Sequence, residues 1–578
     1  MAKELSRNEH LKAGSRQLRG TLNEGLGFEP SGAISEDDQQ LVKFHGMYLQ
    51  DDRDLRGERS RKKLEKAFAF MVRVRIPGGV CNPEQWLAMD YIGRTYGNGT
   101  MRLTTRETFQ FHGIIKSNAR ATIRKLDSVL LNSIAACGDI NRNVLAASNP
   151  HQSRAHAMAY DLCKAVSDHL LPKTRAYREI WIDNEKVAEG GAEPVEVDEP
   201  LYGKAYLPRK FKVVVAVPPS NDIDVFAHDL GYIAILDEAG TLQGWNVTIG
   251  GGMGMTHGDT KTYPRTGDIV GFCKPGDALK VAEAVMTIQR DWGDRSNRAH
   301  ARLKYTVEDY GLDTWRKEID KRAGITLEDP KPFTFTHTGD RYGWTEGEDG
   351  RHHLTLFIEN GRIKDWADGG PQLMTGLREI AKIHDGEFRM TANQNVIIAN
   401  ISRENRPAIE KLAAEHGLTW EASALRRNAM ACVALPTCGL ALAESERYLP
   451  TLVTALEDRL DAHGLSDKDI VIRMTGCPNG CARPYLAEIG LVGKGPGRYN
   501  LYLGAAFDGS RMSKLYAEDV DHDGIVNTLD PLFAAYARER KDDEHFSDFV
   551  IRAGYVAATT NGADFHANTG AKRAVAVA

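Results

Sequence analysis

The stretch RMTGCPNGCARPYLAEIG, residues 473–490, carries two cysteines around a Pro-Asn-Gly turn, with three residues between them. A second stretch, ACVALPTCGLAL at 431–442, carries two more with five residues between them. Half of the chain's eight cysteines therefore fall in one short region. These four are Cys432, Cys438, Cys477 and Cys481.

Their spacing leaves three interpretations open: zinc ligands, iron–sulfur ligands or unrelated core thiols. Zinc knuckles usually place two to four residues between ligands, so a five-residue gap fits zinc poorly. An iron–sulfur cluster tolerates wider and unequal gaps, because its ligands come from loops that wrap a larger object. Proline and glycine beside each pair let the backbone turn its amide groups toward sulfur. The pattern favours an iron–sulfur cluster. The remaining cysteines are predicted to be small buried residues: Cys81, Cys137, Cys163 and Cys273.

Length, composition and charge narrow the class of protein. A chain of 578 residues is too long for one core and predicts about three domains. The N-terminus MAKELSRNEHLKAGS has no apolar segment typical of a signal peptide, and no apolar run is long enough for a membrane span. We therefore expect a cytoplasmic chain without stable disulfides. The formal net charge of −5 argues against bulk binding of nucleic acid.

Several segments have a clear periodicity. Apolar and basic residues alternate in FAFMVRVRIPGG (68–79), which predicts a strand with Arg73 and Arg75 on its polar face. MRLTTRETFQFHGI (101–114) is interpreted as one further strand-like segment with a polar side. Helical spacing is predicted over 118–136 and 277–292. The glycine-rich 249–254 is not followed by a helix-forming sequence, which excludes a dinucleotide-binding loop.

The sequence also contains a weak internal repeat. GTMRLTTRETFQF (99–111) and GEFRMTANQNVII (386–398) share a Gly-x-x-Arg-(Leu/Met)-Thr pattern, and each follows a segment ending in IPGG or IENG. FKVVVAVPPSND likewise matches IVIRMTGCPNGC, with GWNVTIGGG and YNLYLGAAF following in turn. The repeat predicts a pseudo-symmetric pair of α/β units with a ligand between them.

Taken together with RLTTRETFQFHG, NRNVLAASNP, LPRKFK and TANQN, the two cysteine stretches closely resemble the haemoprotein subunits of NADPH-dependent assimilatory sulfite reductases, members of the sirohaem nitrite/sulfite reductase family. The resemblance extends from NEHLKAGSRQLRGT to FVIRAG, nearly the whole chain. It implies a mixed α/β (α+β) fold of three domains with an internal pseudo-two-fold repeat and cofactors at the domain junction. One local departure is TCGLA, where close relatives often have TCPLA, so that Gly439 replaces proline.

The resemblance also implies cofactors and site residues. The four cysteines match ligands of one [4Fe–4S] cluster, and Cys481 matches the thiolate that also ligates the sirohaem iron. Sirohaem carries carboxylates and sulfite is an anion, so burying them requires cations. Substrate-binding cations are matched by Arg75, Arg142, Lys210 and Lys212. Positions lining the cofactor pocket are matched by Arg102, Arg106, Gln110, Arg209, Lys304 and Gln394. Asn141 and Asn143 are expected to hold the loop around Arg142. His112 is a candidate general acid, but a structural hydrogen-bonding role is equally consistent with FQFHG, so it is not included in the catalytic set.

The implied activity is the six-electron reduction of sulfite to sulfide, for cysteine biosynthesis. The chain shows no flavin or nucleotide-binding signature, so the resemblance implies a flavoprotein alpha subunit that delivers electrons from NADPH. A sirohaem nitrite reductase is the nearest alternative; Lys212, where nitrite-reducing relatives tend to have asparagine, favours sulfite. A non-catalytic protein that binds metal through its four cysteines is the alternative from another class.

Five regions are predicted along the chain. An N-terminal arm or partner-docking segment covers 1–62, and a ferredoxin-like repeat domain covers 63–143 plus 340–418. The first sirohaem-binding α/β domain covers 144–339, and the second, with the cluster cysteines, covers 419–560. A flexible tail is predicted for 561–578.

Overall fold

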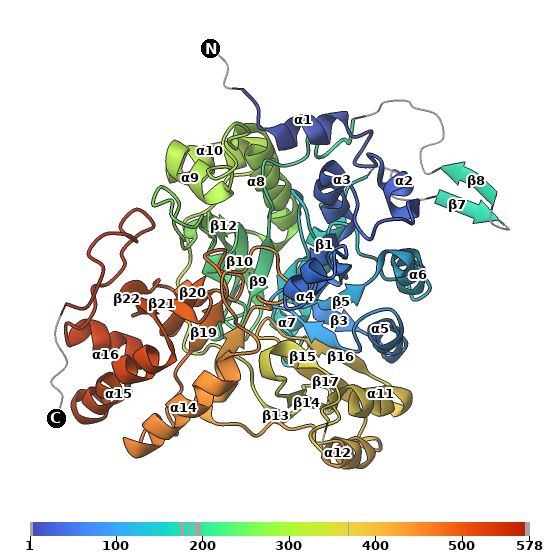
Figure 1. The fold of residues 1–578 in the computed structure, drawn as a ribbon. Helices are drawn as coiled ribbons and strands as arrows, with labels where there is room; N and C mark the ends of the chain where they lie inside the picture. The colour runs from blue at the N-terminus through green and yellow to red at the C-terminus, as the bar shows by residue number, and fades with distance from the viewer. Residues whose placement is uncertain (1–3, 174–178, 183–184, 190–197, 368, 573–578) are drawn as a thin grey trace.

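Four five-stranded sheets dominate the molecule (Figure 1). The computed structural model describes residues 4–173, 179–182, 185–189, 198–367 and 369–572. Within these residues no helix has the length and apolar character that crossing a membrane requires. A separate two-stranded hairpin is formed by β7 (Glu179–Ile182) and β8 (Glu185–Glu189).

The first two sheets are antiparallel duplicates of each other. One has the order β1-β2-β5-β4-β15 and the other the order β13-β14-β17-β16-β3. The strands of the first are β1 (Met47–Asp51), β2 (Phe68–Arg73), β5 (Phe109–Ile114), β4 (Met101–Leu103) and β15 (Arg362–Ile363). Those of the second are β13 (Gly343–Glu346), β14 (His352–Leu356), β17 (Val396–Ile401), β16 (Glu387–Met390) and β3 (Val80–Cys81).

Each of these sheets borrows its last strand from the other half. After a short 3₁₀ turn at Pro77–Gly79, β3 leaves its own half and pairs with β16; after the corresponding turn at Glu359–Gly361, β15 pairs with β4. The middle residue of both turns has a left-handed backbone, with φ of 63° at Gly78 and 52° at Asn360. The predicted repeat around IPGG and IENG is therefore confirmed as a reciprocal exchange of strands.

The other two sheets carry the second repeat. Both run in the same order, three parallel strands followed by two antiparallel ones. The first contains β6 (Leu145–Ala146), β9 (Val213–Ala216), β10 (Leu230–Leu236), β11 (Leu242–Ile249) and β12 (Asp268–Cys273). The second contains β18 (Ala429–Ala431), β19 (Ile472–Thr475), β20 (Ile489–Gly495), β21 (Arg498–Leu503) and β22 (Lys514–Val520).

Helices cover the sheets. The two ferredoxin-like sheets carry α5 (Pro83–Thr95), α6 (Lys116–Asp127), α11 (Leu373–Ile383) and α12 (Arg406–Glu415). The first α/β domain has α7 (Arg154–His169), α8 (Ala278–Trp292), α9 (Leu303–Tyr310) and α10 (Leu312–Ala323). The second has α13 (Ala424–Arg427), α14 (Leu449–Ala462), α15 (His522–Glu539) and α16 (Phe546–Arg552). The N-terminal region forms α1 (Arg7–Gly14), α2 (Leu22–Gly27), α3 (Glu36–Leu41) and α4 (Arg56–Arg61).

Two predicted elements differ from the structure. The single strand expected over 101–114 is a hairpin, because the chain turns at TTRET, where Glu107 has a φ of 50°. The helix expected over 118–136 spans 116–127. Helical geometry does not continue to 136, because Leu130 has a φ of 60°; this leucine is 92% exposed. The helix at 277–292 is confirmed as α8, and the segment after β11 forms no helix, as expected.

The ends of the chain are better ordered than their composition predicted. β1, placed in the N-terminal arm by the sequence, pairs with β2 as an integral strand of the sheet. In the predicted flexible tail, Phe565 is 1% exposed and stacks on Tyr502, with ring centroids 5.8 Å apart. Residues 561–572 therefore pack against the second α/β domain, and residues 573–578 lie outside the described part of the chain.

Candidate active site

The two cysteine pairs meet at one edge of the second α/β sheet. Cys432 follows the last residue of β18, and Cys477 comes two residues after the end of the neighbouring parallel strand β19. Because carboxyl ends of parallel strands lie at the same edge, residues far apart in sequence converge there. Burial, and then the charge of Cys481, raise the pKa of both Cys432 and Cys477, the latter to about 11. Three of the thiols are buried or half-buried, whereas Cys481 is exposed.

Backbone and side-chain N–H groups surround the sulfur atoms. The amide of Gly476 donates to Cys432 Sγ over 3.3 Å, and Asn479 Nδ2 donates to Cys477 Sγ over 3.3 Å. The amides of Leu440 and Ala441 lower the pKa of Cys438 against the larger effect of its burial. Within the described residues no three His, Cys, Asp or Glu side chains are close enough together to hold a single metal ion. The loops present N–H groups to the thiols, as predicted, and among the described residues the thiols are not already arranged around a single metal ion.

A set of cations from the first α/β domain faces this edge. Burial, and then the positive charges of Arg302, Arg142 and Arg209, lower the pKa of Lys210 to about 7, while the thiol of Cys481 opposes the shift. Burial and the neighbouring Lys210 bring the pKa of Lys212 well below its usual range. The structure therefore brings Lys210, Lys212 and Arg142 together, opposite Cys481.

Arg75, predicted to belong to this set, points elsewhere. Its guanidinium donates to Ser167 Oγ over 2.7 Å and pairs with Asp168 Oδ1 at 3.0 Å, both on α7. Arg73 lies on the inner side instead: it donates to Gln110 Oε1 over 2.8 Å and, with Arg142, lowers the pKa of Tyr48 against the raising effect of burial. The reason is that β2 ends at Arg73, and Arg75 bridges to Asn132 outside the sheet, so strand alternation no longer applies.

Four of the predicted cofactor-pocket residues fall into two groups. Arg102 and Lys304 are already bonded to protein groups. Arg102 binds Glu446 Oε2 at 2.8 Å and the carbonyl of Ala431 at 2.8 Å, and so holds the strand that leads to Cys432. Lys304 donates to the carbonyls of Gly252 (3.3 Å), Gly254 (2.7 Å) and Tyr263, which uses all three of its N–H groups. These two residues organise the walls of the site.

The second group retains polar atoms without partners. Gln394 is 1% exposed, has a φ of 72°, and neither its amide oxygen nor its amide nitrogen has a partner. The Nε atoms of Arg73 and Arg106 are likewise buried and unpaired. Unsatisfied buried polar groups are costly, which indicates that a polar ligand completes them. Gln110 and Arg209 belong to neither group: Gln110 bridges Arg73 and His112, and Arg209 lies 4.0 Å from Asp139.

The structural roles considered for Asn143 and His112 agree with their contacts, whereas Oδ1 of Asn141 is buried without a partner. Asn143 accepts from the amide of Ile76 and donates to its carbonyl, each over 2.8 Å, which fixes the loop behind Arg142. His112 is 1% exposed and bonds to Gln110 over 2.8 Å. At Gly439 a Cβ would meet no atom within 4 Å, so no close contact at this position requires glycine.

Sequence reasoning missed several residues of the site. Arg302 pairs with Asp229 at 2.9 Å and contributes to the low pKa values of Lys210 and Lys212. Arg302 lies in the basic segment ARLKY (301–305), of which the predicted site includes only Lys304. Arg73 could have been found from its position two residues before Arg75 in the same alternating strand. His228, which lies 3.3 Å from Arg106, has no signal in its local sequence.

The chain is similar to proteins of known class over nearly its full length. Family models match at 164–327, described as the nitrite and sulphite reductase 4Fe-4S domain, and at 62–129 and 345–416, described as the nitrite/sulfite reductase ferredoxin-like half domain. The match of the latter model to two segments agrees with the duplicated sheets.

Curated relatives support the same assignment. The sulfite reductase [NADPH] hemoprotein beta-component of Methylobacterium sp. (strain 4-46) is 68% identical over 572 residues, covering 99% of this chain and 94% of that protein. The protein of the same name from Shouchella clausii is 60% identical, covering 96% and 97%. Among solved structures, the Mycobacterium tuberculosis NirA protein aligns with a TM-score of 0.76 at 25% identity, covering 95% of this chain and 97% of that one. The chain therefore belongs to the nitrite and sulfite reductase family, in the group of the sulfite reductase hemoprotein beta-components.

Proposed function

We propose that this chain is the catalytic subunit of an assimilatory sulfite reductase, which reduces sulfite to sulfide with six electrons. The observation that carries the proposal is the convergence of Lys210, Lys212 and Arg142 opposite the exposed Cys481. A dianion suits a site in which several cations lower one another's proton affinity, because its charge relieves their mutual repulsion. Nitrite carries a single negative charge and would offset less of the repulsion among these cations.

The residues present fit a [4Fe–4S] cluster and sirohaem. Cys432, Cys438, Cys477 and Cys481 would hold the cluster, and we assign the link to the sirohaem iron to Cys481 because it is the exposed thiol. The unpaired N–H groups of Gln394 and Arg106 suit the carboxylates of a tetrapyrrole. When bound, these cofactors supply electrons and an iron at which sulfur–oxygen bonds break.

The chain's own residues supply charge and protons. We assign Arg73, Arg142, Lys210 and Lys212 to sulfite, with Arg73 replacing Arg75 because only Arg73 lies on the inner side. The arginines keep their charge and orient the oxyanion through planar N–H pairs. A lysine with a pKa of about 7, such as Lys210, can donate a proton as each oxygen departs as water.

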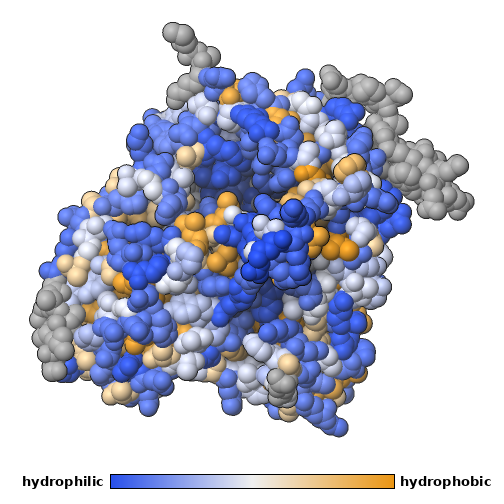
Figure 2. Space-filling model, viewed as in Figure 1, coloured by the Kyte–Doolittle hydropathy of each residue, from blue (hydrophilic) through white to orange (hydrophobic). Residues whose placement is uncertain are grey.

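A flavoprotein alpha subunit is the proposed electron donor, and α4 marks its docking surface. Residues 56–66 contain six Arg or Lys and two Glu, and α4 has no buried residue. Arg53, just before α4, donates to the carbonyl of Ala441 over 2.7 Å in the loop that follows Cys438. Figure 2 shows a hydrophilic projection where Figure 1 places α4, flanked by hydrophobic surface, and Leu440 beside Cys438 is 68% exposed. An acidic, flavin-bearing domain complements this surface close to the cluster ligands.

The experiment that tests the activity is steady-state assay of protein produced together with sirohaem synthesis. We expect a visible tetrapyrrole spectrum, iron and acid-labile sulfide for one cluster, and sulfide formation with a kcat/KM for sulfite above that for nitrite. A higher kcat/KM for nitrite would assign the chain to nitrite reduction. A colourless protein that binds metal without activity would leave only the structural role of the four cysteines.

A further inference from the structure

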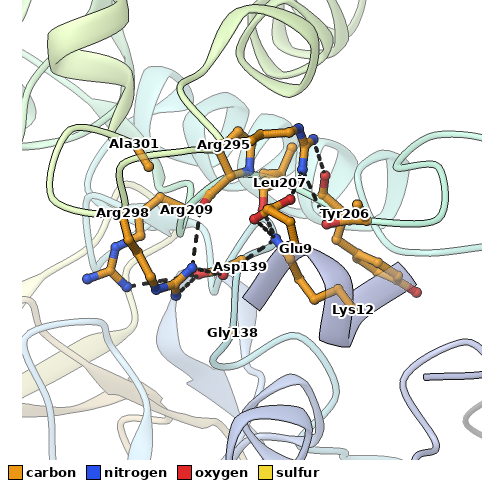
Figure 3. Close-up of polar contacts among 12 residues, drawn as sticks. Glu9, Lys12, Gly138, Asp139, Tyr206, Leu207, Arg209, Arg295, Arg298 and Ala301 are labelled. Atoms are coloured by element: carbon orange, nitrogen blue, oxygen red, sulfur yellow. Dashed lines mark hydrogen bonds and ion pairs between the residues drawn. The ribbon is translucent and has the colours of Figure 1, made fainter. Parts of the chain in front are cut away.

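Helix α1 turns two charged side chains into the protein (Figure 3). Glu9 is 1% exposed and Lys12 is 3% exposed, although charged residues of a short surface helix usually face water. Burying an ion pair costs desolvation free energy that the pairing does not reliably recover. A buried pair in the N-terminal helix therefore calls for a role beyond stability.

The ammonium group of Lys12 connects two segments of the first α/β domain. Its Nζ lies 2.6 Å from Glu9 Oε1, donates to the carbonyl of Leu207 over 2.7 Å, and lies 3.7 Å from Asp139 Oδ2. Glu9 also pairs with Arg295, whose guanidinium donates to the carbonyl of Tyr206 over 2.7 Å. Figure 3 shows Lys12 and Glu9 on α1 reaching the loops that carry these residues.

The same two segments carry three of the four cations assigned to sulfite. Asp139 comes three residues before Arg142, and Leu207 comes three residues before Lys210. The segments are also bonded to each other, by the amide of Leu207 to the carbonyl of Asp139 over 3.1 Å, and by the amide of Arg142 to the carbonyl of Phe211 over 2.9 Å. Lys12 therefore binds both arms of the anion site just behind its cations.

Asp139 makes this arrangement sensitive to charge. Its carboxylate is buried, and the guanidinium of Arg298, at 2.8 Å, together with Lys12 holds its pKa at about 2 against desolvation. Arg209 is only loosely held, with its NH1 4.0 Å from Asp139 Oδ1. Without the charge of Lys12, less of the negative charge of Asp139 would be neutralised. Asp139 would then draw Arg209 toward itself and away from Lys210 and Arg142, with which Arg209 interacts electrostatically.

We propose that Lys12 is a positioning residue of the anion site: it neutralises Asp139, binds the carbonyl of Leu207, and so fixes Arg142, Arg209 and Lys210 relative to one another. The N-terminal helix thereby becomes part of the catalytic unit. The inference rests on the proposed function, because it takes sulfite as the anion of this site.

The test compares Lys12→Met with Lys12→Arg in the full-length, cofactor-loaded enzyme, and with Lys382→Met as the control. Lys382 is an exposed lysine of α11 that pairs with the glutamate three residues before it, at 2.7 Å, as Lys12 does, but away from the site. We expect the dissociation constant for sulfite, measured by calorimetry, to rise about tenfold in Lys12→Met, roughly 1.4 kcal/mol. KM should rise in parallel while kcat changes much less. Lys12→Arg should recover most of the affinity, and Lys382→Met should match the wild type.

A folding defect has a different signature. If Lys12→Met does not fold, the double variant Glu9→Gln/Lys12→Met removes both charges together and is tested in its place. Unchanged sulfite affinity in a folded variant overturns the proposal, as does a loss of kcat and cofactor content with an unaltered dissociation constant. A wild-type protein that binds sulfite without reducing it removes the proposed function but leaves the binding comparison valid.

Discussion

Lys210 interacts electrostatically with charged groups of both α/β domains. Its charge is destabilised by burial and by Arg302, Arg142 and Arg209, and stabilised by the thiol of Cys481 from the other domain. A lysine in such a position loses its proton far more readily than one in water. The charge of Lys210 in turn lowers the pKa of the neighbouring Lys212, so a proton on one lysine makes the other harder to protonate.

This predicts a pH dependence governed by Lys210. Lys210 can donate a proton only while protonated, so kcat for sulfite should fall as the pH rises through its pKa of about 7. Bound anions oppose the surrounding cations, so the fall should lie at or above that value. Lys210→Met should lower kcat by about 10²–10⁴-fold, typical for loss of a general acid. Rates measured from acidic to alkaline pH provide the check, and an unchanged profile in Lys210→Met would assign proton donation elsewhere.

The depressed pKa of Glu446 predicts that the free energy of unfolding also depends on pH. Its carboxylate pairs with Arg362 at 2.6 Å and Arg102 at 2.8 Å, and these guanidinium groups hold its pKa at about 2 against burial. A depressed pKa means that its contribution to the free energy of unfolding is complete above the usual glutamate value and is lost as the pH falls toward 2.

Glu446→Gln should therefore lower the free energy of unfolding by about 3 kcal/mol at neutral pH, because it leaves two buried guanidinium groups without their anion. The difference from the wild type should shrink between pH 4.5 and 2. Urea unfolding at several pH values measures it. Glu444→Gln is the matched control, since the ion pair of Glu444 with Arg447 is far more exposed. A constant difference across this pH range would contradict the assignment.

At the scale of elements, the loops after β18 and β19 depend on close backbone contacts. Gly476 precedes Cys477, and its amide donates to Cys432 Sγ. A Cβ at Gly476 would lie 2.5 Å from both Ala434 Cβ and the carbonyl oxygen of Ala443, whereas one at Gly439 would meet nothing within 4 Å. Only the first glycine is required by packing.

Gly476→Ala should accordingly separate the two cysteine loops, at a cost of about 1–3 kcal/mol in stability, the range for overpacking a tight contact. Iron and acid-labile sulfide per chain should fall with it. Gly439→Ala, one loop away, should leave both quantities unchanged. Thermal unfolding and cluster content measured for the pair give the test, and equal effects of the two substitutions would show that loop packing does not control the site.

At the scale of the whole molecule, the position of the site follows from the duplication of the α/β sheet. The 3₁₀ turns at Val225–Ala227 and Pro484–Leu486 occupy equivalent positions before β10 and β20, and each follows a residue with a left-handed backbone, Asp224 and Arg483. These two residues pair with each other across the domains, and Arg473 joins them at 2.7 Å. Equivalent turns of the two α/β domains therefore meet at a buried cluster of ion pairs.

The docking surface at α4 belongs to the same scale. Reversing charge there, with Arg59→Glu and Arg61→Glu together, should slow electron transfer from the flavoprotein, and the deficit should diminish as ionic strength rises. Activity with a small chemical reductant should not change. Lys411→Glu on α12, where Lys411 is 75% exposed, controls for net charge. An equal loss with both kinds of reductant would place the effect in the site itself.

The sequence by itself determined the family, the four clustered cysteines, both internal repeats and most of the cationic residues. These depend on residue type and local spacing, which are visible in one dimension. Tertiary structure decided the rest. Arg73 rather than Arg75 faces inward because β2 ends between them, and residues 101–114 turn back as a hairpin. Lys304 is bound by backbone carbonyls, and Lys12 reaches Asp139 and Leu207 across more than a hundred residues. Where a buried charged side chain points, and which group it pairs with, depend on the residues that the fold brings next to it. A local sequence pattern does not contain that information.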